Sequence, residues 1–185
     1  LRKSSGSLDL LTEAKLERRL RVATRNLTAL NAAYYIAEML REMTVEHAPH
    51  PELFRLAHDS LIYLDTLQPT QNQEVAHCVM HFELGALRLL GHLPALGHCA
   101  ECGRELRPAR RVAFGFVNGG ALCQQCRQGK RQVASVSVAA IEAMRNLAAE
   151  GELPQNYVPS RAIAGELRGL INRYMCNLLG HQPRT

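Results

Sequence analysis

Two Cys-x-x-Cys pairs, separated by twenty residues, constrain the fold of this chain more than any other feature of its sequence. The first pair is Cys99 and Cys102, and the second is Cys123 and Cys126. A Cys-x-x-Cys turn brings two sulfur atoms to the same side of a tight bend. Two such turns supply the four tetrahedral thiolates that a structural Zn²⁺ ion takes. The sequence therefore predicts a zinc module held by these four cysteines.

Between the two pairs, the pattern predicts a short β-hairpin. Large apolar residues alternate with smaller ones over residues 111–117, and the Asn-Gly-Gly stretch at 118–120 is a strong reversal signal. The chain then returns directly to Cys123. Because so short a segment has few apolar residues to bury, we expect its fold to depend on the metal ion.

Three other interpretations of the cysteines were weighed against structural zinc. Two disulfides would require an oxidising compartment, and the first residues of the sequence show no apolar core of an export signal. A redox-active Cys-x-x-Cys would be a single pair near a βαβ unit. A catalytic zinc ion would need an open coordination position, which four thiolates do not leave. The cofactor we expect is structural zinc.

Outside the cysteine segment, apolar periodicity predicts five helices and a mainly α fold. The apolar content is mostly Leu, Ala and Val, which favours helix, and no apolar run reaches the ~18 residues of a membrane span. The first helix is predicted to bury a stripe that includes Leu16, Leu27 and Tyr34, and Thr70 with Gln73 predicts a capping box for the third. The predicted ranges are about 13–46, 51–67, 71–90, 137–150 and 160–180.

Charge is distributed unevenly along the chain, whose formal net charge is +5. Residues 13–25 carry five basic and two acidic groups, and residues 99–131 carry seven basic and two acidic groups. Residues 26–98, in contrast, carry three basic and eight acidic groups. Basic clusters of this kind are typical of surfaces that bind a polyanion, although many basic faces are only solvated.

The candidate residues for binding DNA or a partner come from the two basic segments. Those of the cysteine module belong to a small rigid unit, and their guanidinium groups can fork onto phosphates. They are Arg104, Arg107, Arg110, Arg111, Arg127, Lys130 and Arg131. The others, Arg18, Arg21 and Arg25, fall on one stripe of the first predicted helix, for which a solvated face is the favoured interpretation.

The remaining reactive side chains receive structural interpretations. His77 and His81, four residues apart on the third predicted helix, could chelate a metal, but no carboxylate–histidine motif surrounds them. His98 could replace a cysteine ligand, although four cysteines already suffice. Cys78 and Cys176 are expected to be buried free thiols. The sequence offers no catalytic triad, phosphate-binding glycine loop or pair of catalytic carboxylates, so no catalytic residue and no enzyme are expected.

The order of these segments resembles the C-terminal region of the bacterial RecO family of recombination mediators. The most specific matches are FELGALRLLGHLP at residues 82–94, which leads into the first cysteine pair, and GGALCQQC at 119–126, which carries the second. LLTEAKL at 10–16 and PELFRLAHDSLIYLD at 51–65 extend the resemblance over nearly the whole chain. The resemblance implies a helical domain, formed by residues 13–97 and 132–185, with a zinc module at 98–131. It also implies a preceding OB fold, of which residues 1–12 look like a remnant strand, or else a leader.

The resemblance further implies a function in DNA repair, DNA damage and recombination. Such a protein would bind single- and double-stranded DNA, and would promote recombinase loading or strand annealing. Its implied partners are RecR and the C-terminal tail of single-strand-binding protein (SSB). Its implied place is the bacterial cytoplasm at the nucleoid, without membrane contact. The main alternative is a protein-interaction scaffold that has a structural zinc module and no direct DNA binding, and an enzyme with such a module is the third hypothesis.

Overall fold

The computed structural model describes residues 2–3, 9–16, 18–21, 25–107, 109–149 and 159–183. Within these ranges the chain forms five helices and two small antiparallel sheets, which confirms the mainly α prediction. The helices are α1 (Leu27–Met43), α2 (Pro51–Thr66), α3 (Asn72–Leu89), α4 (Val138–Ala148) and α5 (Arg161–Leu179). The strands are β1 (Arg2–Lys3), β2 (Asp9–Leu10), β3 (Arg111–Gly115), β4 (Gly120–Leu122) and β5 (Val133–Ser137). No helix in the described ranges has the length and apolar character needed to cross a membrane.

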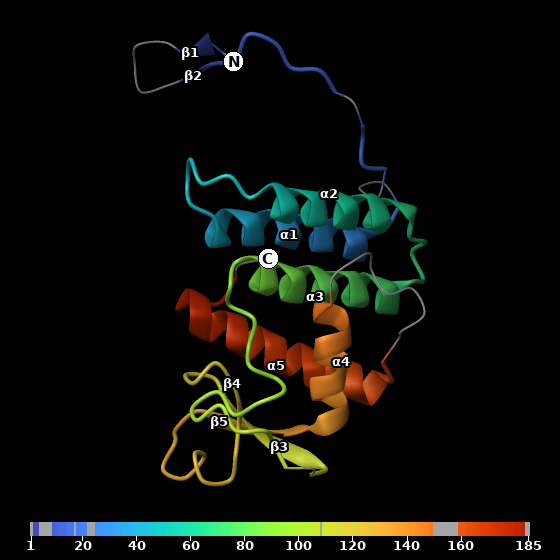
Figure 1. Ribbon diagram of the computed structural model, residues 1–185. Coiled ribbons are helices and arrows are strands. Elements are labelled where there is room, and N and C mark those ends of the chain that lie inside the picture. The colour runs from blue at the N-terminus through green and yellow to red at the C-terminus, as the bar shows by residue number, and fades with distance from the viewer. Residues whose placement is uncertain are drawn as a thin grey trace.

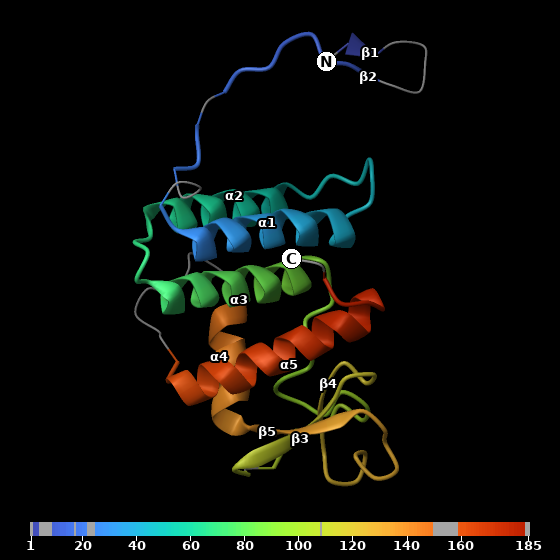
Figure 2. The ribbon, with the colours of Figure 1, turned by 180° about the vertical axis from the view of Figure 1, so that it is seen from behind.

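The helices are stacked above the larger sheet (Figure 1). α1 and α2 run side by side at one end of the molecule, α3 lies against them, and α4 and α5 lie between α3 and the β3–β5 sheet, as the view from behind also shows (Figure 2). The β1–β2 hairpin lies apart from the helices, beyond α1 and α2. The β3–β5 sheet and the cysteine segment therefore occupy the opposite end of the molecule from α1 and α2.

The start of the first helix differs most from the sequence prediction. Residues 11–16 and 18–20 lie outside any helix, and α1 begins only at Leu27. The described residues before α1 instead make contacts near the C-terminal end of α2. Asp65 accepts a hydrogen bond from the backbone N–H of Arg21 at 2.5 Å, and Asn26 donates to the carbonyl of Gln68 at 3.1 Å. Asn26 also caps the helix, because its side chain accepts from the Ala29 N–H at 3.1 Å.

The buried face of α1 is also different from the predicted stripe. Leu16, Leu27 and Tyr34 are 74%, 72% and 60% exposed. The face that packs against α2 and α3 instead carries three alanines among its buried residues, which are Ala29, Ala32, Ala33, Tyr35, Ile36 and Met39. Leu27 and Tyr34 instead share the exposed side of the helix with Asn31 and Arg41, so the face that packs is the one that is apolar throughout.

The other helices begin and end close to the predicted residues. Pro51 opens α2, and the hydroxyl of Ser137 caps α4 by accepting from the Ala140 N–H at 3.2 Å. Ser160 caps α5, which ends at Gly180 in the left-handed conformation. The capping box predicted for α3 is wrong, because the N-cap residue is Gln71 and its side chain accepts from the Gln68 N–H instead. The predicted stop of α4 at Gly151 lies outside the described residues.

The larger sheet has the strand order β4-β3-β5, which confirms the predicted hairpin and adds a strand that the sequence analysis missed. Phe114 of β3 lies opposite Ala121 of β4 and Ala134 of β5. Phe114 is buried and packs edge-on against Tyr174 of α5, with ring centroids 5.9 Å apart. Apolar packing therefore holds the sheet against the helices. Because β5 is Val133–Ser137, the sheet extends beyond residue 131, the predicted end of the module.

Glycine is required at position 120, the first residue of β4, because the backbone of Ala95 lies against it. Its φ is +153°, and a Cβ atom there would lie 2.4 Å from the carbonyl oxygen of Ala95. Ala95 donates to the Gly119 carbonyl at 2.9 Å and accepts from the Ala121 N–H at 2.8 Å. The Gly-Gly pair therefore allows the segment after α3 to cross the hairpin in direct backbone contact.

A buried charge cluster joins three helices, and the sequence analysis missed it. Glu83 of α3 is fully buried, accepts from the Tyr35 hydroxyl of α1 at 2.5 Å, and pairs with Arg168 of α5 at 2.5 Å. Burial raises the pKa of Glu83, and the Arg168 guanidinium and the Tyr35 hydroxyl act in the opposite direction. Both carboxylate oxygens thus have a partner, as a buried carboxylate requires.

Candidate metal centre and arginine-lined hollow

The four predicted cysteine ligands meet at one point of the module. Their sulfur atoms all lie within 4.8 Å of one another, and those of Cys102 and Cys123 are 3.9 Å apart. A tetrahedral ion with Zn–S bonds of about 2.3 Å would place its sulfurs about 3.8 Å apart. All six cysteines are free thiols. The donor set therefore fits a tetrahedral metal ion, and it is the one group of metal-binding type that the described residues contain.

Backbone hydrogen bonds in the two turns hold the sulfurs in place. In the first turn, Gly103 donates to the Cys99 carbonyl at 2.9 Å, and Cys99 donates to the Arg104 carbonyl at 2.8 Å. In the second turn, Arg127 donates to the Cys123 carbonyl at 3.0 Å. The N–H of Cys123 points at the sulfur of Cys99 from 3.4 Å, which connects the two turns. His98 is exposed and pairs through its backbone with Glu105, so it is outside the ligand set.

Hydrogen bonds within the cluster shift the pKa values of three of the four thiols. Burial acts to raise the pKa of Cys99, but N–H groups of Cys123, Cys102 and Glu101 outweigh it and hold the pKa at about 6. Arg104 lowers the pKa of Cys102 by donating to its sulfur at 3.3 Å. The hydrogen-bonded neighbours Cys123 and Cys102 raise the pKa of Cys126 to about 12. A divalent cation would stabilise the four groups together as thiolates.

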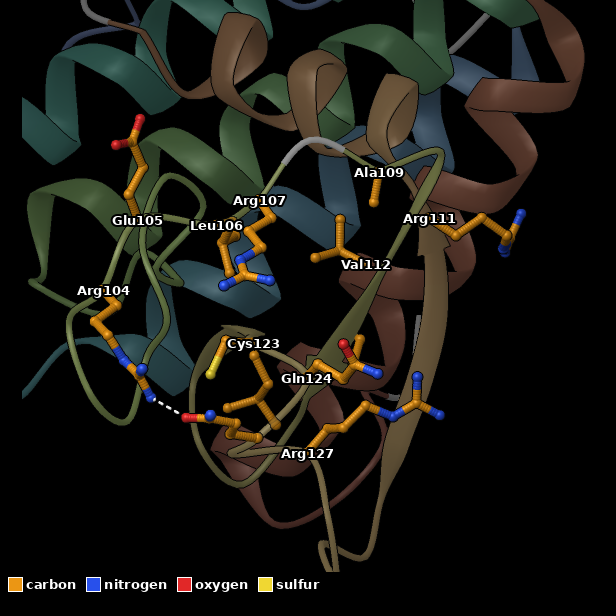
Figure 3. Close-up of a pocket in the computed structure, with 13 residues that line it drawn as sticks. Arg104, Glu105, Leu106, Arg107, Ala109, Arg111, Val112, Cys123, Gln124 and Arg127 are labelled. Atoms are coloured by element: carbon orange, nitrogen blue, oxygen red, sulfur yellow. Dashed lines mark hydrogen bonds between the residues drawn. The ribbon is translucent and has the colours of Figure 1, made fainter.

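A hollow of about 540 Å³ lies beside this centre (Figure 3). Four of the predicted basic residues surround it, namely Arg104, Arg107, Arg111 and Arg127. Apolar and amide side chains complete the lining, including Leu106, Val112, Leu122, Gln124 and Gln125. The sequence analysis did not single out these last five residues, because only the hairpin fold brings 104–113 and 122–127 together.

Two of the predicted basic residues are neutralised by carboxylates. Arg111 donates to the Ser135 carbonyl at 2.6 Å and pairs with Glu166 of α5 at 2.8 Å. Lys130 pairs with Glu101 at 2.8 Å, which links the two cysteine turns. Glu166 also accepts from Ser137. Although burial opposes them, these contacts lower its pKa. Arg111 and Lys130 therefore stabilise the module in addition to any binding function.

Arg107 and Arg127 remain available to a ligand. Among the described residues, no acidic side chain pairs with either of them, and the carboxylate of nearby Glu105 points away from the hollow (Figure 3). Arg104 is held differently, by the sulfur of Cys102 and by Gln125, whose side-chain oxygen it approaches at 2.6 Å. The hollow thus has two unpaired cations and one that the metal-binding turn orients.

The other predicted basic residues lie elsewhere. Arg110 and Arg131 are exposed on the module but outside the lining of the hollow. Arg18, Arg21 and Arg25 precede α1 and share no helix, so their predicted helical stripe is wrong. The backbone N–H of Arg21 is bound to Asp65 of α2, away from the cysteine module. The structure therefore brings together four of the ten predicted residues.

The buried histidines and the remaining thiols have structural surroundings. His77 and His81 are both buried on α3, and His81 contacts the Leu147 carbonyl at 2.9 Å. Burial lowers the pKa of both rings, which favours their neutral forms. Cys78 is buried as predicted, and burial raises its pKa to about 12. Cys176 is only half-buried on α5.

These observations define a helical domain that carries a four-thiol centre on a small β-sheet. The family described as "Recombination protein O C terminal" matches residues 24–185. The chain belongs to this family, and the resemblance seen in its sequence is confirmed.

Two relatives illustrate the extent of the match. A protein of Rhodopirellula baltica named DNA repair protein RecO is 39% identical over 98% of this chain and 74% of its own length. A protein of Myxococcus xanthus with the same name is 32% identical over 88% of this chain and 62% of its own length. This chain therefore corresponds to about two thirds of the length of these relatives.

Proposed function

We propose that this chain acts in DNA repair and homologous recombination as a non-enzymatic mediator that binds DNA through the cysteine module. The family membership supports the repair role, since the relatives are named DNA repair proteins. The observation that carries the proposal is the pair of unpaired arginines, Arg107 and Arg127, at the hollow. Guanidinium groups bind phosphates by forked hydrogen bonds, and contact with phosphates requires no particular base sequence.

The metal ion that we propose is Zn²⁺, bound by Cys99, Cys102, Cys123 and Cys126. Four thiolates close its coordination sphere, so the ion would stabilise the turns and leave no open position for a substrate. Its chemistry is therefore structural. Ligand binding would be the function of the arginines near the ion. The Cys102 sulfur orients Arg104, and the second turn carries Arg127.

The proposed partners are single- and double-stranded DNA, RecR, and the acidic C-terminal tail of SSB. The basic module suits DNA or the acidic tail, and the acidic segment 26–98 is left for other protein contacts. Together these contacts would promote recombinase loading or strand annealing.

The test is binding of a fluorescent oligothymidylate to the metal-loaded chain, measured by anisotropy at increasing salt. Arg107→Gln with Arg127→Gln should weaken binding and flatten the salt dependence, by about 0.7 in the logarithmic slope for each phosphate that is no longer neutralised. Arg41→Gln with Arg55→Gln, at exposed positions of α1 and α2, is the charge-matched control. Equal affinity and slope for both double variants would overturn the proposal. Arg111 is unsuitable for this test because it is bound to Glu166.

A second candidate function is a protein-interaction scaffold without direct DNA binding. It is favoured by the ion pairs of Arg111 and Lys130, which reduce the free positive charge of the module. Under this alternative, the Arg107 and Arg127 variants would lose SSB or RecR in pull-down experiments and would leave oligothymidylate binding unchanged.

A further inference from the structure

We propose that the arginine-lined hollow is a subsite for a single nucleotide of unpaired DNA. The base would enter the hollow while Arg107 and Arg127 bind the phosphates on either side of it. This inference rests on the proposed DNA-binding function and goes beyond it, because it assigns a place to the base as well as to the backbone.

The lining of the hollow is more apolar than a phosphate site requires. Its volume of about 540 Å³ is in the range of small-ligand pockets, about 300–1,000 Å³. Leu106, Val112 and Leu122 contribute apolar surface to it. A phosphate gains nothing from apolar surface, whereas the face of a base does. Among the described residues no aromatic side chain lines the hollow, so the faces of the base would lie against aliphatic side chains.

Amide groups at the hollow suit the edge of a base. Gln124 and Gln125 both line it, and the oxygen of Gln125 is occupied by Arg104 at 2.6 Å. This contact leaves the NH₂ group of Gln125 as a donor of fixed orientation, while exposed Gln124 can donate or accept. One fixed donor and one adaptable amide accommodate different bases, which suits binding without strict sequence preference.

The arrangement favours single strands over duplex DNA. In a duplex, the bases are paired and stacked, and extracting one from the stack is unfavourable. An unpaired strand does not incur this cost. We therefore expect the subsite to contribute to single-strand binding only, while phosphate contacts by the arginines act on both forms.

The test compares an oligothymidylate with an abasic strand of the same length and charge. The metal-loaded wild-type chain should bind the abasic strand about fivefold or more weakly, because that strand has no base to bury against the apolar lining. Leu106→Ser should remove this difference and leave the affinity for the abasic strand unchanged. Val117→Ser, at a 69% exposed position of the same module outside the hollow, is the control and should keep the difference. Metal content verifies folding, and Val112→Ser replaces Leu106→Ser if the latter loses metal.

A fluorescence measurement tests the position of the base directly. The chain has no Trp, so Gln124→Trp would provide a single reporter at the hollow. Its emission should be quenched by oligothymidylate and not by the abasic strand, because only a base can stack on the indole.

The outcomes separate this inference from the proposed function. Equal wild-type affinity for both strands, with Arg107→Gln weakening both, overturns the nucleotide subsite and leaves DNA binding in place. Failure of the wild-type chain to bind any strand overturns the proposed function. If Leu106→Ser weakens the binding of an acidic peptide with apolar C-terminal residues, and does not change the ratio between thymidylate and abasic strands, then the hollow is a peptide site and the inference is wrong.

Discussion

The helical body, formed by α1 to α5, and the cysteine module at residues 98–131 are stabilised by different means. Thirty-two buried apolar residues of the described chain form the core of the body, including Phe82, Leu84 and Leu87 of α3. The module has a cluster of its own with only three buried residues, Cys99 among them. A cluster of this size cannot offset the loss of chain entropy on folding. The body can therefore fold by burying apolar surface, whereas the module depends on its metal ion.

The dependence between the two regions runs in one direction. Phe114 and Phe116 of the hairpin, and Val136 of β5, belong to the core of the body. The hairpin that carries the second cysteine pair is thus anchored to α5, while no helix requires the metal centre for its packing. We infer that losing the metal leaves the body folded, and that losing the body disrupts the module.

Metal removal provides the most severe test of this asymmetry. Chelation should unfold the turns at 98–107 and 123–131, since a structural zinc ion contributes about 10–16 kcal/mol of apparent binding free energy in small zinc domains. Helix content should persist, because the helices are packed by the core. Far-UV circular dichroism and hydrogen exchange, with and without chelator, measure the two effects.

A matched pair of cysteine variants accompanies the chelation experiment. Cys102→Ser should lose stoichiometric metal, whereas Cys176→Ser, at a half-buried position of α5 outside the sulfur cluster, should retain it. A loss of most helix content together with the metal would contradict the asymmetry.

The next largest effect is expected when the core of the body, rather than the metal centre, is disrupted. Leu87→Asp buries an unpaired carboxylate at a position with no exposure, which should cost more than the about 2–5 kcal/mol of a Leu→Ala cavity. Because the hairpin rests on the same core, metal binding should fail as well. Urea unfolding and metal content are the measurements, with Leu27→Asp on the exposed face of α1 as the control. A variant with an unfolded body that still binds metal would show that the module is independent.

Sequence patterns succeeded where the deciding interaction is local. The two cysteine pairs, the Asn-Gly-Gly reversal and the serine caps each depend on a few neighbouring residues, and the structure contains the sulfur cluster, the hairpin and the caps. Periodicity also placed α2, α3 and α5 within two residues of their ends.

Patterns failed where distant residues decide. The first helix begins later than predicted, and the hydrogen bond of Arg21 to Asp65 in the preceding segment joins positions 44 residues apart. The face of α1 that packs against α2 and α3 carries Ile36 and Met39 beside its alanines, and it is not the stripe that spacing predicted. The partners of Glu83 lie on two other helices, so a lone acidic residue within an apolar run gave no indication of either. The hollow likewise exists only after β3 pairs with β4.

The buried charge cluster tests whether the body relies on apolar packing alone. Arg168→Ala leaves the carboxylate of Glu83 buried without its counter-charge, and breaking such a pair costs about 3–5 kcal/mol. Arg173→Ala removes an exposed guanidinium stacked on Phe116 at 4.4 Å and should cost about 1 kcal/mol or less.

The pH dependence of the Arg168→Ala variant gives a further readout. Arg168 lowers the pKa of Glu83 against burial, so its removal raises that pKa further. A carboxyl whose folded pKa is raised is penalised above its unfolded pKa and is relieved as the pH falls below its folded pKa. The destabilisation measured by urea unfolding should therefore shrink in acid. A deficit that is constant with pH would mean that the missing guanidinium acted only through packing.

The smallest losses of stability are expected from removing helix caps. Two caps are compared, one at the junction of body and module and one remote from it. Ser160 makes a single capping bond to the Ile163 N–H, and Ser160→Ala should cost about 0.5–1 kcal/mol. Ser137 caps α4 and also donates its hydroxyl to Glu166 at 2.5 Å. Glu166 in turn binds Arg111 of β3, so Ser137→Ala should cost more, and the pKa of Glu166 should rise towards its ordinary value. Thermal unfolding and NMR titration measure both quantities, and equal costs for the two caps would mean that apolar packing alone couples the sheet to the helices.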